Sequence, residues 1–113
     1  MDTSNSLDQL LSLARRVNNE WCWPAAAAED AIVAIAALNL AVLGIEIWEF
    51  DDSDSVVVKG WSQYELPSGE WSEVVRSSAR LARDGVFEHS GNIGLWVNLT
   101  WGTQQEVGES SNG

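Results

Sequence analysis

The residues with the clearest chemical character are a group of carboxylates at the end of an alternating strand pattern. They are Glu46, Glu49, Asp51, Asp52 and Asp54. Carboxylates grouped in this way can attract a basic protein surface. They do not match a calcium loop, which needs alternating ligands, a glycine and a distal glutamate. We therefore expect no metal, and we interpret the group as a surface for a positively charged partner; a solvated hairpin turn is the alternative.

Aromatic side chains lie close to these carboxylates in the chain. Trp48, Trp61 and Tyr64 could anchor a partner, because tryptophan and tyrosine often dominate the binding energy of protein interfaces. Trp48, Trp61 and Trp96 are expected on the outer face of a sheet, unless the first helix or the segment 21–23 folds over them. The expected partner-binding residues are Glu46, Trp48, Glu49, Asp51, Asp52, Asp54, Trp61 and Tyr64.

Catalytic patterns are missing from the sequence. A nucleophilic site at His89, the only histidine, would need Cys22 or a serine brought close to it and oriented by a carboxylate. There is no G-x-S-x-G, H-E-x-x-H, phosphate-binding glycine loop or dinucleotide fingerprint. We expect no enzymatic activity and no cofactor, and a small hydrolase that uses His89 is the remaining enzymatic alternative.

The chain as a whole is strongly acidic. Its 113 residues carry 17 Asp and Glu against 6 Lys and Arg, a net charge of -11. Nucleic acid and anionic membrane surfaces are excluded as expected partners, because clustered Lys and Arg bind both. The first residues lack the pattern of a secretory signal, and the single cysteine, Cys22, cannot form an internal disulfide. We therefore expect a cytoplasmic protein.

Three helices are predicted from the spacing of apolar residues. The first is amphipathic and covers residues 7–17, with Leu7, Leu10 and Leu11 on its apolar side. The second, residues 24–40, is apolar on almost all sides and is expected at the centre of the fold. The third covers residues 68–83, with Ser68 as its cap and Gly85 near its end.

Three strands are predicted from two-residue alternation. They begin after Gly44, at Val56 and at Ile93, and the first two form a hairpin. The side chains expected to face the helices are Leu43, Ile45, Ile47, Leu95, Val97 and Leu99. The prediction is a single α+β domain over residues 1–102, with a small antiparallel or mixed three-stranded sheet packed on about three helices. Residues 103–113 are expected to form a flexible polar tail.

Four segments of the chain together resemble a known class of protein. They are residues 43–50 (LGIEIWEF), 60–62 (GWS), 71–79 (WSEVVRSSA) and 95–101 (LWVNLTW). This pattern is similar to that of bacterial polymorphic-toxin immunity proteins. The resemblance implies neutralisation of a toxin through a tight complex, and it supplies no catalytic residues.

The expected function is therefore binding of a cognate, basic toxin domain so that its active site is occluded. The protein would act as a monomer or a weak homodimer. The alternative is a small acidic secretion chaperone, which would hold an effector protein as a homodimer through the second helix or an exposed strand edge.

Overall fold

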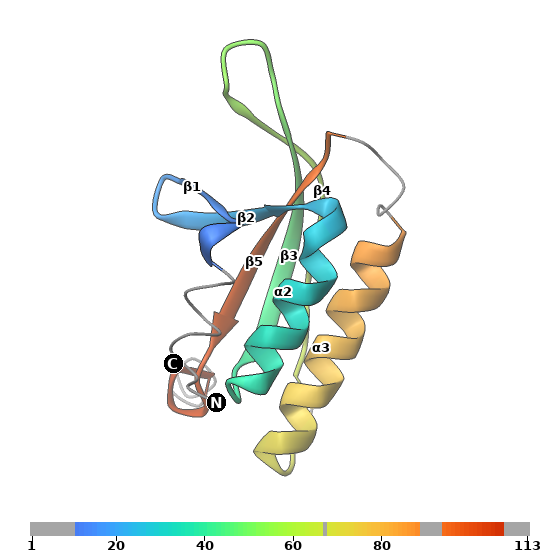
Figure 1. Cartoon of the computed structure of the whole chain (residues 1–113). Coiled ribbons are helices and arrows are strands. Elements are labelled where there is room, and N and C mark those ends of the chain that lie inside the picture. The colour runs from blue at the N-terminus through green and yellow to red at the C-terminus, as the bar shows by residue number, and fades with distance from the viewer. Residues whose placement is uncertain (1–10, 67, 89–93, 108–113) are drawn as a thin grey trace.

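Two helices lie against one face of a five-stranded antiparallel sheet in the computed structural model (Figure 1). The structure describes residues 11–66, 68–88 and 94–107. Its elements, in chain order, are β1 (Arg15–Val17), β2 (Glu20–Pro24), α2 (Ala25–Ala37), β3 (Ala41–Phe50), β4 (Val56–Gln63), α3 (Trp71–Phe87) and β5 (Trp96–Gly102). The predicted α+β single domain is confirmed, and the sheet is larger than predicted. No helix in the described ranges is long and apolar enough to cross a membrane.

The two additional strands, β1 and β2, form a hairpin where a helix was predicted to end. Asn18 and Asn19 have φ angles of 52° and 69°, and Val17 pairs with Glu20 across them. A two-residue turn with two positive φ angles matches the twist of a hairpin, and asparagine tolerates this conformation. Leu11 and Ser12 are helical, so the predicted helix ends at Ser12 and its extension through Val17 is wrong; residues 1–10 lie outside the described ranges.

The sheet order is β1-β2-β5-β3-β4, so β3 is paired on both sides and β4 is an edge strand. β3 is antiparallel to both neighbours: Glu46 is opposite Trp61 on β4 and opposite Asn98 on β5. The β3–β4 register shifts between Ile47 and Trp48, and the shift leaves Lys59 as an extra residue on β4. This bulge interrupts the ladder of the edge strand.

The core lies between the sheet and the two helices. Ile45, Ile47, Val97 and Leu99 are buried in it, as predicted for the inner face, whereas Leu43 and Leu95 are partly buried against the core. Small and branched residues of α2 meet them, and the fully buried ones are Ala28, Ala31, Ile32 and Ile35. Buried alanines bring the α2 backbone close to the sheet, because they add little volume between them.

Helix α3 differs from its prediction at both ends. It begins after Glu70, without a side-chain cap, so Ser68 is not the cap. It also continues through Gly85 to Phe87. A Cβ at Gly85 would lie 2.8 Å from Cδ1 of Ile45, so glycine here permits close packing of α3 on β3 instead of ending the helix.

The segment after β5 begins with a short helical turn, residues 104–107. The Thr103 amide donates to Oε1 of Glu106 at 2.9 Å, and the Glu106 amide donates to Oγ1 of Thr103 at 3.2 Å. This reciprocal pair is a capping box, and it orders residues that were predicted to be a flexible tail. Residues 108–113 lie outside the described ranges.

Candidate partner-binding surface

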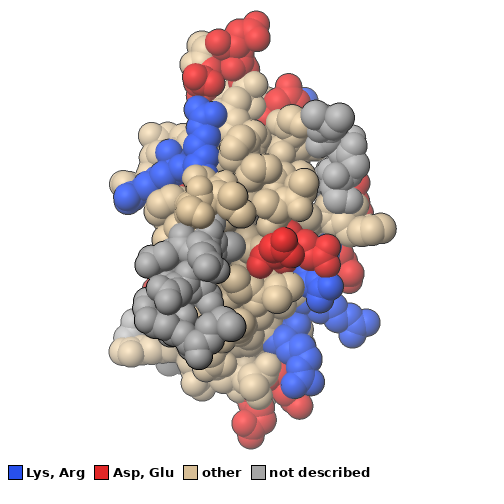
Figure 2. Space-filling view, in the orientation of Figure 1, with Lys and Arg blue, Asp and Glu red and all other residues tan. Residues whose placement is uncertain are grey.

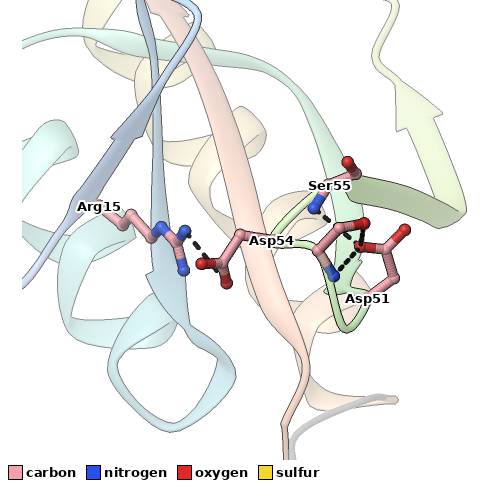
Figure 3. A network of polar contacts seen from close by, with 5 residues as sticks. Arg15, Asp51, Asp54 and Ser55 are labelled. Atoms are coloured by element: carbon pink, nitrogen blue, oxygen red, sulfur yellow. Dashed lines mark hydrogen bonds and ion pairs between the residues drawn. The ribbon is translucent and has the colours of Figure 1, made fainter.

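The β3–β4 hairpin extends beyond the rest of the domain, and the side chain of Asp51 orders its tip (Figures 1 and 3). Oδ1 of Asp51 accepts hydrogen bonds of 2.9 Å from the Ser55 amide, the Ser53 amide and the Ser53 hydroxyl. These bonds, with the Ser55 amide contributing most, lower the pKa of the Asp51 carboxyl. The tip is therefore a defined turn whose carboxylate stays charged.

Asp54 connects the tip to the β1–β2 hairpin. Its φ angle is 60°, its amide donates to the Asp51 carbonyl at 2.9 Å, and its carboxylate lies 3.7 Å from the Arg15 guanidinium. Arg15 also lies 3.9 Å above the ring centre of Phe50. Figure 2 shows acidic atoms at this end of the molecule with basic atoms directly beneath them. Part of the Asp54 charge is therefore balanced within the molecule, whereas Glu49 and Asp52 are exposed.

The three tryptophans expected on one face differ widely in exposure. Trp61 is 70% exposed and Trp48 is 3% exposed. Trp96 is partly buried, and its ring lies edge-on to Phe50 with 5.6 Å between the ring centres. Of the two expected anchors among them, Trp61 is accessible to a partner and Trp48 is not.

Buried Trp48 positions Glu46 instead of offering a surface. Its indole Nε1 donates to Oε1 of Glu46 at 2.8 Å. Glu46 is partly exposed and lies directly opposite Trp61 in the β3–β4 register. The structure therefore brings Glu46, Trp48 and Trp61 together: the carboxylate is bonded to the buried indole, and the exposed indole is opposite on the neighbouring strand.

Tyr64 belongs to the other side of the sheet. Its hydroxyl donates to the Leu81 carbonyl of α3 at 3.4 Å, and its ring packs against the main core. Burial, with a smaller effect from Asp84, raises the pKa of the phenol to about 12. The structure therefore does not place Tyr64 with Trp61 and Glu46 as an anchor of one surface.

A hollow of about 270 Å³ lies beside Glu46 and Trp61 on the outer face. Gly44, Gln63 and Thr100 also line it, and sequence reasoning did not include them in the site. A Cβ at Gly44 would lie 2.9 Å from the Ser62 carbonyl oxygen, so a side chain there would collide with β4. The signal that could have found the hollow is a glycine two residues before Glu46 within an alternating strand.

Asn98, opposite Glu46 on β5, is another residue that was not predicted to belong to the site. It is 2% exposed, it pairs in register with Glu46, and its Nδ2 donates to the Trp21 carbonyl at 2.9 Å. This bond satisfies a buried amide and fastens β2 to β5 beside the hollow.

Two features of the described residues bear on the catalytic alternatives. The described part of the chain contains no group of three or more His, Cys, Asp or Glu residues that could hold a metal ion. Cys22 is buried, its thiol donates to the Arg15 carbonyl at 3.5 Å, and burial raises its pKa to about 11. A thiol in this state is a poor nucleophile. His89, the residue of the hydrolase alternative, lies outside the described ranges.

No protein-family model, curated protein or solved structure matches this chain.

Proposed function

We propose that this protein is an immunity protein that binds a basic bacterial toxin domain and occludes its active site. The proposal begins from the resemblance of residues 43–50, 60–62, 71–79 and 95–101 to such proteins. The observation that carries it is the composition of one hairpin. The β3–β4 hairpin combines exposed carboxylates at its tip with an exposed indole, Trp61, nearer its base.

Order at the tip supports a binding role. The hydrogen bonds to Asp51 and the ion pair between Arg15 and Asp54 hold the turn in one conformation. A surface that is already ordered loses less conformational entropy on binding. Exposed Glu49 and Asp52 would then attract the partner, and such steering can raise association rates by about 10- to 1,000-fold.

The proposal predicts that a toxin domain is encoded beside the gene, and the decisive experiment uses that domain. The purified domain, titrated with this protein, should lose its activity at a molar ratio of about one. Replacement of Trp61 by Ala should weaken the complex about 30-fold, mainly through faster dissociation, if Trp61 is an anchor. A toxin domain that remains fully active in excess of this protein would refute the proposal.

The steering role has its own test. The double variant Glu49→Gln, Asp52→Asn should slow association at low salt and reduce its dependence on salt. Glu73→Gln is the control, because Glu73 is exposed in the first turn of α3, at the opposite end of the molecule from the tip (Figure 1). Association rates that stay constant from low to high salt would count against steering.

Apolar side chains on the edge strand favour one alternative, the homodimeric secretion chaperone. Val57 and Val58 on β4 are 42% and 50% exposed. Two copies could pair through such an edge. Size-exclusion chromatography with light scattering separates the two functions: a stable dimer that keeps an unfolded client soluble supports the chaperone. A monomer that inactivates a folded toxin supports immunity.

A further inference from the structure

We propose that the hollow beside Glu46 and Trp61 receives one arginine side chain of the partner protein. This inference rests on the proposed function, because it names the chemistry by which the toxin would be recognised. The hollow lies on the outer face, away from the helices, and its lining comes from β3, β4 and β5. Its volume of about 270 Å³ is far above the roughly 10–15 Å³ that one water molecule needs, so it has room for a group larger than water.

The charge of Glu46 favours a cationic occupant. Trp48 donates to one carboxylate oxygen, and an indole N–H is neutral, so it orients the group without balancing its charge. The ion pairs of the described residues are Arg15 with Asp54 and Arg83 with Glu29. Within the described ranges the Glu46 carboxylate is thus held in a fixed position with its charge unmatched.

Other carboxylates on this hairpin are less suited to holding a single cation. Asp51 uses one oxygen to order the turn, and Asp54 already faces Arg15. Glu49 is exposed, and solvent weakens an isolated contact at such a position. Glu46 differs because it is partly buried and lines a hollow with defined walls.

Trp61 makes arginine a better occupant than lysine. Its indole lies opposite Glu46 in the strand register and lines the same hollow. A guanidinium can stack on an indole face while it donates to a carboxylate, whereas an ammonium is a point charge with stronger hydration. Gln63 and Thr100 add polar groups at the walls, which can accept the remaining guanidinium hydrogens.

Gly44 lines the hollow without adding a side chain to it. Gly44 has the same strand parity as Glu46, and it pairs with Gln63 on one side and with Thr100 on the other. One planar cation in the hollow would therefore lie over Gly44, contact the carboxylate of Glu46 and stack on the indole of Trp61.

The test uses peptides in place of the toxin, so its result is independent of toxin neutralisation. Blocked Gly-Arg-Gly, Gly-Lys-Gly and Gly-citrulline-Gly are titrated into the ¹⁵N-labelled full chain and followed by NMR. The arginine peptide should shift the indole N–H signals of Trp48 and Trp61 saturably, with a dissociation constant on the order of 10 mM. The lysine peptide should bind more weakly, and the neutral citrulline peptide should cause no saturable shift.

Variants then locate the binding. Glu46→Gln should weaken arginine binding about tenfold, which corresponds to loss of one charge-assisted hydrogen bond. Glu73→Gln on α3 makes the same chemical change at an exposed position and should leave binding unchanged. The inference is overturned by equal shifts with citrulline, by unaltered binding to Glu46→Gln, or by no indole shift up to about 100 mM peptide. If one of these results is found and the protein still neutralises the toxin, the arginine site is refuted and the proposed function is not.

Discussion

Replacing Ser78 by Ala should remove a hydrogen bond that fastens α3 to β3. Ser78 is fully buried, and its Oγ accepts from the Val42 amide at 3.0 Å while it donates to the Val75 carbonyl at 2.9 Å. The β3–β5 register shifts between Val42 and Gly44, where the amide meets the helix. In the alanine variant the Val42 amide would remain buried without this acceptor.

The expected loss follows from these contacts. An unsatisfied buried backbone donor costs about 1–3 kcal/mol, and alanine returns roughly 0.5 kcal/mol through its higher helix propensity. The free energy of unfolding should therefore fall by about 1–2 kcal/mol. With a urea m-value on the order of 1–2 kcal/mol/M, the unfolding midpoint should fall by roughly 1 M.

Urea unfolding followed by tryptophan fluorescence measures this loss, and Ser72→Ala is the matched control because Ser72 is exposed on the same helix. Amide hydrogen exchange gives a second readout, in which the Val42 amide should exchange faster in Ser78→Ala. If Ser78→Ala and Ser72→Ala unfold at the same midpoint with unchanged Val42 exchange, the assigned role of Ser78 is wrong.

Two further predictions concern buried titratable groups. The Tyr64 phenol, with its pKa raised from 10.0 to about 12 by burial and Asp84, ionises first in the unfolded chain. The stability that the un-ionised phenol contributes is complete below the pKa of the unfolded chain and disappears as the pH rises through the pKa of the folded protein. The free energy of unfolding should therefore decline less steeply in Tyr64→Phe across this alkaline window. Equal declines in the two proteins would contradict this prediction. Cys22, with its pKa raised from 9.0 to about 11, should react with Ellman's reagent far more slowly in the folded protein than in guanidinium. Equal reaction rates would show that the thiol is accessible.

The inner face of the sheet was predictable because burial on one side leaves a two-residue period in the sequence. Ile45 and Ile47 on β3 and Val97 and Leu99 on β5 follow that period and are buried together. The α+β class followed from this alternation and the helical spacing of α2 and α3. These features depend on the spacing of apolar residues along the chain, which is visible in the sequence itself.

The first hairpin was missed because Ala14 and Val17 fit the apolar stripe of a helix, although Ala14 precedes β1 and Val17 ends it. The sequence does contain a local signal for the hairpin turn. Asn18 and Asn19 are consecutive asparagines, and asparagine tolerates positive φ angles. Turn chemistry was therefore more informative here than apolar spacing.

The candidate site was predicted only in part, because alternation assigns a side chain to a face without saying what else lies on that face. Trp48 and Trp61 illustrate this, since one is buried and the other is exposed. Tyr64 follows the last residue of β4 and turns to α3, which depends on tertiary packing. The hydrogen bond between Trp48 and Glu46 likewise appears only once the rings are placed in space.

The extra residue on β4, Lys59, has a consequence for self-association. An open edge strand with exposed valines is a template on which further copies can polymerise into fibrils. The bulge at Lys59 puts the two halves of β4 out of phase, so an incoming strand would pair in regular register with only one half at a time. Pairing of a second copy at this point would also have to remove water from the ammonium group of Lys59. One irregular residue thus discourages amyloid-like growth along this edge of the sheet.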